Sequence, residues 1–287
     1  MSIKKAIIPL GGLATRFLPA SKAVPKGMFP VVDKPILQYL VEELSECGVT
    51  EILILVGRNN EAVFNHFDKI PELYDVLQRD NKLALLEKAE KPCKLANILY
   101  KRIYEPRGVA DVIMQTKTFV GNDPFFVVFG DELFYNNEKS SIKQMVELFD
   151  KTGKCVIGCY SVDKKDVSKY GIMAIDNVDG ILNVTNIVEK PKVEEAPSTL
   201  SAVGKYVLTA DVFEILEEVN KNFNKETNYT EALNILAHNG KLVASDLVGE
   251  RYDTGGKLGY LLANVAYGLK DPEIADKLKE ELTKMLG

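Results

Sequence analysis

The residues best suited to chemistry lie in the N-terminal segment of the chain. A short apolar run ends at Pro9, and after Leu10 come Gly11 and Gly12 and then the cations Arg16 and Lys26. Glycines let backbone N–H groups approach a ligand closely, and cationic side chains neutralise a polyanion. This order of residues predicts a site for a chain of phosphates at the end of a buried strand.

The glycine turn does not belong to either of the best-known phosphate-binding patterns. It matches neither GxGxxG nor GxxxxGK[ST], so dinucleotide-binding and phosphate-loop interpretations lose their specific support. The alternative is an ordinary tight turn with surface cations. Pro19 and Pro25 count against that alternative, because a stiffened loop loses less entropy when it closes around a ligand.

Composition excludes several classes of protein. The chain has 287 residues, is 46% hydrophobic and carries a formal net charge of -5, which disfavours non-specific binding of nucleic acid. It has no apolar stretch of about 18–20 residues, so no membrane span is expected. The first residues lack the apolar region of a signal peptide, which favours a cytoplasmic location.

Cysteine and histidine offer little support for a metal or nucleophile site. The four cysteines show no CxxC spacing, and we expect them to be buried free thiols. The two histidines, His66 and His238, lie far apart in the sequence. A zinc site or a histidine-based catalytic triad is therefore not expected.

Apolar periodicity predicts an α/β fold with helices on both faces of a doubly wound, mainly parallel, mixed sheet. Short apolar runs alternate with helical patterns in the first half, as in Rossmann-like proteins. The middle of the chain shows strands joined by Asp-Gly and Asn turns, which predicts a small β-rich insertion, and the C-terminal part is helical. Strands are expected at 6–8, 52–56, 98–103, 124–129, 155–160, 172–175, 181–188, 203–208 and 242–247, and helices at 36–47, 60–67, 72–91, 210–219, 229–237 and 271–285.

Motifs recur in order along the whole chain, from GGLATRFLPASKAVPKGMFPVVDKPILQY near the N-terminus to YDTGGKLGY from Tyr252. In these motifs the chain resembles the sugar-phosphate nucleotidylyltransferases, most closely the bacterial UTP-glucose-1-phosphate uridylyltransferases. The family pattern AGLGTRxLPxTKxxPKEMLPxVDKPxIQY corresponds here to GGLATRFLPASKAVPKGMFPVVDKPILQY. Further matches follow in the same order, among them NHFD from Asn65, EPRG from Glu105, VEKP from Val188 and YDTGGKLGY from Tyr252.

The resemblance implies a reaction and a cofactor. In the family, glucose 1-phosphate attacks the α-phosphate of UTP, which gives UDP-glucose and pyrophosphate with the help of Mg²⁺. The attacking group is already an oxyanion, so alignment and neutralisation of charge are what this chemistry requires. The absence of a catalytic histidine or cysteine agrees with that requirement.

The resemblance also implies which residues act on the phosphates. Arg16, Lys26 and Lys190 match the cationic positions that hold the triphosphate and the sugar phosphate. Asp131 follows the apolar run PFFVVFG, where ligands bind in α/β proteins, and matches the magnesium aspartate. Asp253 matches a second acidic position near the metal, and oxygen ligation of this kind suits Mg²⁺.

Two further sets of residues match substrate-binding positions. Leu10, Gly11, Gly12 and Gly108 match the positions that contact the nucleotide. For the sugar, the resemblance implies contacts from Gly171, Glu189, Lys190, Gly204 and Glu226. A carboxylate such as Glu189 is a good sugar ligand because it accepts hydrogen bonds from two adjacent hydroxyls.

Some residues depart from the family pattern on the nucleotide side. Ala14 stands where the family has a second loop glycine, Gly27 where it has Glu, and Val109-Ala110-Asp111 where it has LGH. Ile103 stands where relatives have a Gln that reads the base, and its side chain cannot form hydrogen bonds. Two alternatives therefore remain open, a nucleotidylyltransferase for another substrate such as dTTP or CTP, and a weakly active regulatory paralogue.

We expect a single nucleotidylyltransferase domain over residues 1–287. Its nucleotide-binding part is expected at 1–135, its sugar-phosphate-binding part at 136–260 and a helical segment at 261–287. By analogy with the family, the C-terminal helix is a candidate contact surface of a homodimer or homotetramer.

Overall fold

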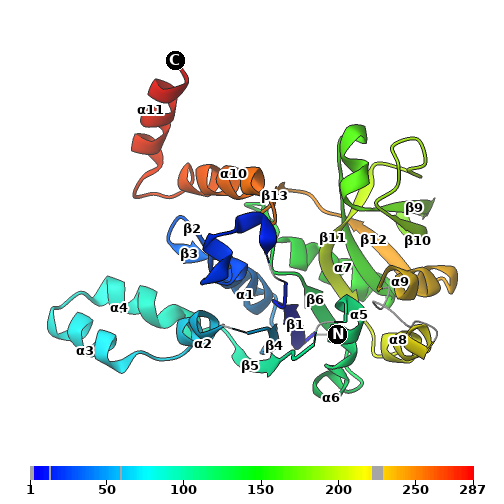
Figure 1. Cartoon of the computed structure of the whole chain (residues 1–287), viewed down its shortest axis with the longest axis horizontal. Coiled ribbons are helices and arrows are strands. Elements are labelled where there is room, and N and C mark those ends of the chain that lie inside the picture. Colours follow the sequence, from blue (N-terminus) through cyan, green and yellow to red (C-terminus); the bar gives the residue numbers. More distant parts are fainter. Residues whose placement is uncertain (1–2, 13, 59, 106, 222–228) are drawn as a thin grey trace.

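A nine-stranded mixed sheet forms the centre of the protein (Figure 1). The computed structural model describes residues 3–12, 14–58, 60–105, 107–221 and 229–287. The strands follow the spatial order β5-β4-β1-β6-β11-β8-β12-β10-β9. Their bounds are β1 Lys5–Pro9, β4 Glu51–Val56, β5 Asn97–Arg102, β6 Phe125–Val128, β8 Cys155–Ser161, β9 Gly171–Val178, β10 Ile181–Glu189, β11 Leu200–Leu208 and β12 Leu242–Asp246.

The strands of the first half pair in parallel and are covered on both faces. β1 pairs in parallel with β4 on one side and with β6 on the other, and β5 continues the parallel set beyond β4. Ile7 of β1 faces one hydrophobic core, whereas Ala6 and Ile8 face the other. Such wholly apolar strands are typical of a sheet buried between two layers of helices.

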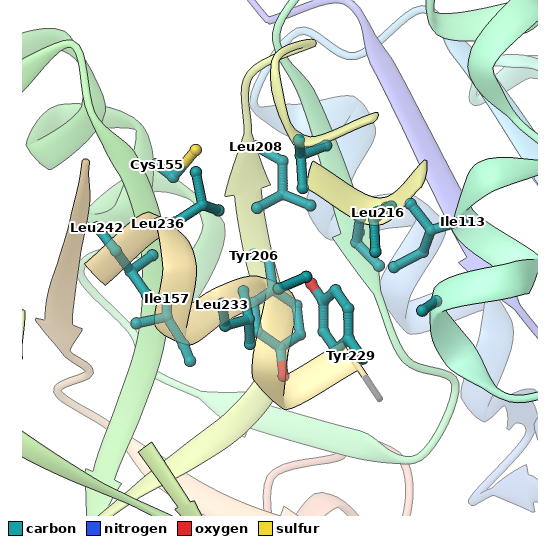
Figure 2. Packing of buried hydrophobic residues seen from close by; sticks show 14 of the residues in the cluster. Ile113, Cys155, Ile157, Tyr206, Leu208, Leu216, Tyr229, Leu233, Leu236 and Leu242 are labelled. Carbon is teal, nitrogen blue, oxygen red and sulfur yellow. The ribbon is translucent and has the colours of Figure 1, made fainter. Parts of the chain in front are cut away.

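Helices supply both layers. One core contains residues of α1 (Ile36–Glu46), α2 (Glu61–Phe67), α7 (Ser141–Thr152) and α10 (Lys257–Gly268). The opposite core contains residues of α5 (Val109–Met114), α6 (Lys117–Val120), α8 (Val212–Lys221) and α9 (Tyr229–His238). Figure 2 shows this second core, where Leu216 of α8 lies beside Ile113 of α5 and Leu233 of α9 lies beside Tyr206 of β11. The predicted doubly wound α/β fold is confirmed.

The second half of the sheet is mainly antiparallel. β11 runs antiparallel to β6 and β8, and β9 and β10 form a hairpin whose turn contains Asp179 and Gly180, both with positive φ. The predicted β-rich elaboration therefore extends the central sheet. A separate two-stranded ribbon, formed by β7 (Glu132–Tyr135) and β13 (Glu250–Asp253), stands beside it, and β2 (Pro30–Val31) pairs with β3 (Lys34–Pro35).

The helical predictions need two corrections. The stretch 72–91 is two helices, α3 (Pro71–Arg79) and α4 (Leu83–Glu90), because Asn81 adopts a left-handed conformation with φ 55° and breaks the helix. The C-terminal helix α11 (Ala275–Leu286) begins later than predicted. It projects from the body of the protein beyond α10 (Figure 1) and buries none of its residues.

The thiol and membrane predictions have clear outcomes. All four cysteines are free thiols, but only Cys155 and Cys159 are buried, whereas Cys47 and Cys93 are partly exposed. Among the described residues, no helix is both long and apolar enough to cross a membrane.

Candidate active site

The glycine-containing loop leaves the carboxyl end of β1 as predicted. The N–H of Leu10 donates to the carbonyl oxygen of Leu55 at 2.8 Å, which continues the parallel pairing one residue beyond β1. A Cβ atom on Gly11 or Gly12 would meet no atom within 4 Å. The two glycines therefore leave open space at this edge of the sheet, where α/β proteins bind ligands.

Ala14 adopts a conformation that usually belongs to glycine. Its φ of 47° and ψ of 41° are left-handed, which costs a residue with a Cβ atom about 1 kcal/mol. The hydroxyl of Ser21 donates to the Ala14 carbonyl at 2.8 Å and helps to hold the turn. An alanine in the place of the family's glycine therefore puts strain into this turn.

Gly27 has a packing role in the floor of the loop. A Cβ atom at Gly27 would lie 3.1 Å from Cδ2 of Leu10, and one at Gly130 would lie only 2.4 Å from the same atom. The Leu10 side chain therefore fills space that larger residues at these two positions would need. This packing explains why a small residue stands at position 27. It leaves the neighbouring cation, Lys26, in its place in the site.

Lys26 and Asp131 meet at the centre of the site. Asp131 lies between β6 and β7, and its Oδ2 is 2.6 Å from the Nζ of Lys26. The two side chains are 21% and 36% exposed, so each is accessible to a ligand. The structure thus brings together two predicted site residues that are far apart in the sequence.

Asp253 approaches Asp131 from the β7–β13 ribbon. Its Oδ1 accepts the N–H of Gly255 at 2.9 Å, and its Oδ2 accepts the hydroxyl of Tyr170 at 3.4 Å. Thr254 donates its hydroxyl to the carbonyl oxygen of Asp131 at 2.8 Å, which ties the two segments together. These hydrogen bonds therefore hold the two carboxylates near one another.

The donor set fits a cation that needs few protein ligands. A Cβ atom on Gly255 would lie 2.9 Å from Oδ1 of Asp253 and 3.1 Å from Oδ2 of Asp131. Within the described part of the chain, no group of three His, Cys, Asp or Glu side chains is placed to hold a metal. Mg²⁺ is usually bound by one or two carboxylates together with water and substrate phosphates, whereas zinc is usually bound by a larger set of protein ligands. The donor set here therefore fits Mg²⁺ and not zinc.

One cavity contains the predicted nucleotide-binding residues. It has a volume of about 450 Å³ and is lined by Leu10, Gly11, Gly12 and Gly108 together with Lys26 and Asp131, among others. A neighbouring cavity of about 560 Å³ shares the three loop residues and is lined by Ile103. Ile103 therefore lies beside the nucleotide loop, where the sequence comparison placed the missing base-reading side chain.

A second large cavity contains the predicted sugar-binding residues. Its volume is about 540 Å³, and its lining includes Gly171, Glu189, Gly204 and Asp131. A Cβ atom on Gly171 would lie 3.1 Å from Oε2 of Glu189, and one on Gly204 would lie 2.7 Å from Cβ of Phe129. A side chain at Gly204 would therefore clash with Phe129, whereas one at Gly171 would crowd the Glu189 carboxylate at the wall of this cavity.

Four predicted residues are not among the described residues that line the two cavities. Asp253 is held in the ribbon as described above, and the other three lie at the edge of the site or outside the described structure. Arg16 is exposed, and its Nη1 lies 3.5 Å from the carbonyl oxygen of Gly255, at the edge of the site. Lys190 lies at the rim, where its Nζ is 3.1 Å from Oε1 of Glu189 and both side chains are more than half exposed. Glu226 lies outside the described residues.

The structure adds residues that the sequence did not single out. Glu132 and Tyr206 line the sugar cavity, and Tyr206 faces Tyr229 (Figure 2) with ring centroids 5.3 Å apart. Burial raises the pKa of Glu132, and the nearby carboxylates of Asp131 and Asp253 raise it further. The sequence places Glu132 directly after a predicted metal ligand, and this position could have marked it as a site residue. Its ion-pair partner lies far along the chain, so sequence spacing gives no sign of the contact.

Comparison with known proteins shows the family of the chain. The model of the family described as nucleotidyl transferase matches residues 5–268. A UTP--glucose-1-phosphate uridylyltransferase of Staphylococcus epidermidis is 42% identical over 278 residues, which is 96% of each chain. A UTP-bound UGPase from Acinetobacter baumannii aligns with a TM-score of 0.91 and 33% identity over 98% of this chain and 99% of that chain.

A structure of a UDP-glucose pyrophosphorylase complexed with UDP-glucose is also similar. It aligns with a TM-score of 0.83 and 35% identity, and the alignment covers 94% of this chain and 100% of that chain. Fold, motif order and sequence identity over nearly the full length all agree. The chain therefore belongs to the nucleotidyl transferase family, and curated relatives that it matches over nearly its full length are named UTP--glucose-1-phosphate uridylyltransferases.

Proposed function

We propose that this protein transfers a uridylyl group from UTP to glucose 1-phosphate. The observation that carries the proposal is the position of Lys26 and Asp131. They lie beside a cavity lined by the nucleotide loop, and Asp131 also lines the cavity that contains Glu189. Two substrates bound in the two cavities would meet at this ion pair.

The chemistry requires alignment and charge neutralisation. An oxygen of the glucose 1-phosphate phosphate attacks the α-phosphorus of UTP, a new P–O bond forms, and the bond to the bridging oxygen of the β-phosphate breaks, releasing pyrophosphate. Lys26 neutralises charge on the transferring phosphoryl group, and Arg16 and Lys190 approach from the rims as cations for the other phosphates. The backbone around Gly11 and Gly12 lines the triphosphate path.

Asp131 and Asp253 are proposed to hold Mg²⁺. Bound there, the cation would neutralise phosphate oxygens and orient the triphosphate. In the structure the Nζ of Lys26 lies 2.6 Å from Oδ2 of Asp131, so the lysine contacts the same carboxylate that would bind the cation. The sugar is proposed to bind between Gly171, Glu189 and Gly204, where Glu189 accepts hydrogen bonds from hydroxyls.

The choice of base is the specific point on which a second candidate function rests. Ile103 is 3% exposed and lines the cavity next to the loop glycines. A side chain without hydrogen-bonding groups at this position favours a looser choice among UTP, dTTP and CTP. Transfer of another pyrimidine nucleotide is therefore the alternative.

Location and assembly complete the proposal. We propose a cytoplasmic homo-oligomer, and the exposed α11 offers a contact surface because Met285 and Leu286 are each more than four-fifths exposed. We also propose that residues 1–135 serve mainly the nucleotide, residues 136–260 the sugar phosphate, and residues 261–287 assembly.

A substrate panel tests the proposal. The purified protein is incubated with Mg²⁺, glucose 1-phosphate and one nucleoside triphosphate at a time, while pyrophosphate release is followed and the product is identified by mass. We expect the highest kcat/KM with UTP. A clear preference for dTTP or CTP would replace the lead proposal with the alternative, and folded protein without turnover on any triphosphate would favour a regulatory role.

A further inference from the structure

A buried ion pair lies directly beside the proposed metal carboxylates. Oε1 of Glu132 is 2.5 Å from Nη2 of Arg251, and the two side chains are only 12% and 6% exposed. Glu132 follows Asp131 in the chain, and in the β7–β13 ribbon it stands opposite Asp253. The pair therefore lies in the same ribbon as Asp253 and directly beside Asp131, which immediately precedes β7.

The second oxygen of Glu132 is tied to the sugar cavity. Its Oε2 accepts the backbone N–H of Gly204 at 3.3 Å. Gly204 belongs to β11 of the central sheet and packs tightly on Phe129, where a Cβ atom would be 2.7 Å from that side chain. Glu132 thus connects the ribbon to the wall of the sugar cavity and has no oxygen left without a partner.

Arg251 continues the connection on its other side. Its guanidinium lies 4.7 Å from the centre of the Tyr170 ring. The hydroxyl of Tyr170 donates to Asp253 Oδ2 at 3.4 Å, and its carbonyl oxygen accepts the N–H of Lys190 at 3.0 Å. A contiguous set of contacts therefore runs from one proposed metal ligand to the sugar-phosphate cation.

We propose that Glu132 and Arg251 are positioning residues, which fix the sugar-phosphate half of the site relative to Asp131 and Asp253. The inference rests on the proposed transfer to glucose 1-phosphate. The ribbon pairs with no strand of the central sheet among the described residues. Besides the backbone hydrogen bond from Phe129 to Gly204 just before β7, the Glu132 side chain is a direct tie between the ribbon and β11. In-line attack is sensitive to how the ribbon and β11 align, because a misplacement of about 1 Å costs roughly 10²-fold in rate.

A purely structural role is the competing explanation. Buried ion pairs contribute weakly to stability as intact pairs, but removal of one partner is costly because the other charge stays buried. Burial raises the pKa of Glu132 while Arg251 opposes that rise. A structural role predicts lower stability alone, whereas a positioning role predicts altered kinetics toward one substrate.

The test compares two substitutions of the same type. Glu132→Gln keeps an acceptor for Gly204 but removes the charge that pairs with Arg251. The matched control is Glu43→Gln, because Oε2 of Glu43 on α1 lies 2.5 Å from Nζ of Lys205 in another buried pair. Kinetic constants for both substrates, thermal midpoints, and calorimetric binding of glucose 1-phosphate are measured for each protein.

We expect Glu132→Gln to lower kcat/KM for glucose 1-phosphate by about 30- to 100-fold, with KM for UTP changed by less than about 3-fold. The control should lose stability and keep its kinetics. Kinetics of Glu132→Gln equal to those of the control would overturn the inference. If that variant does not fold, Arg251→Lys replaces it, since lysine keeps the charge but loses the planar contacts. Wild-type kinetics in that variant would also overturn the inference.

The calorimetric arm separates this inference from the proposed function. If the wild-type protein shows no turnover with UTP, the proposed function fails. Weaker binding of glucose 1-phosphate by Glu132→Gln than by the control would still support the positioning role, and equal binding would refute it.

Discussion

The substitution Asp131→Asn separates the catalytic role of the Lys26–Asp131 pair from its structural role. Asparagine has the same shape and still accepts a hydrogen bond from Lys26, so only the charge is lost. The two side chains are 21% and 36% exposed, and pairs with this degree of exposure contribute about 0.2–1 kcal/mol to stability after screening by solvent. For a chain of this size that corresponds to a shift of the thermal midpoint of about 2 °C.

The expected loss of activity is far larger. Asp131 is accessible, reaches both cavities and is proposed to hold the cation that neutralises the phosphates. Loss of one electrostatic contact to a transition state costs about 3–4 kcal/mol, or roughly 10²–10³-fold in kcat. We therefore expect a protein with nearly unchanged stability and turnover lowered by about 10³-fold.

The assay needs a control that makes the same change elsewhere. Asp123→Asn serves, because Oδ2 of Asp123 lies 2.8 Å from Nζ of Lys5 at the opposite, amino-terminal end of β1. Pyrophosphate release is measured over a range of Mg²⁺ concentrations, together with thermal unfolding, for both variants. Turnover of Asp131→Asn within about 10-fold of the wild type would refute the assignment of this carboxylate, and equal losses in the two variants would indicate an effect on folding.

Three further outcomes are expected. Gly204→Ala should lose about 1–3 kcal/mol of stability and bind glucose 1-phosphate more weakly, because its Cβ would lie 2.7 Å from Phe129; calorimetry and thermal unfolding check this. Burial lowers the pKa of His66 below its ordinary value of 6.5, so the unfolded chain binds the proton first and stability should fall as pH drops below that value. His66→Gln should flatten this slope, whereas His238→Gln, at an exposed position, should retain it. Chelation by EDTA should abolish turnover and added Mg²⁺ restore it, and Asp253→Asn should raise the Mg²⁺ concentration needed for half-maximal rate; unchanged Mg²⁺ dependence would remove that residue from the metal site.

Much of the site was predictable because its residues follow strands whose positions are legible in the sequence. Asp131 comes after a wholly apolar run, and the Gly11–Gly12 turn comes after another, so both were expected at the same edge of a parallel sheet. Glu189 ends a strand with a clear apolar pattern. In each of these cases the local pattern determines the end of the strand, and the topology determines where that end lies.

The unpredicted features depend on contacts between distant segments or on single backbone conformations. The β7–β13 ribbon consists of two four-residue strands, which are too short to give a periodic signal, so the pairing of Glu132 with Arg251 was not legible. The break at Asn81 and the left-handed turn at Ala14 each depend on one residue with positive φ. Propensity alone does not reveal such positions, because the surrounding structure decides whether the strain is tolerated.

The wall shared by the two cavities has a consequence for how the reaction ends. Val109, Phe129 and Asp131 line both spaces, so a product that carries a nucleoside at one end and a sugar at the other would contact both at once. Each half then holds the other at a high effective concentration, and the joined molecule binds more tightly than either part. Under the proposed function, departure of UDP-glucose would therefore be slow relative to departure of pyrophosphate. Accumulated UDP-glucose would therefore inhibit the enzyme by competing with both substrates, and this inhibition would need no separate regulatory site.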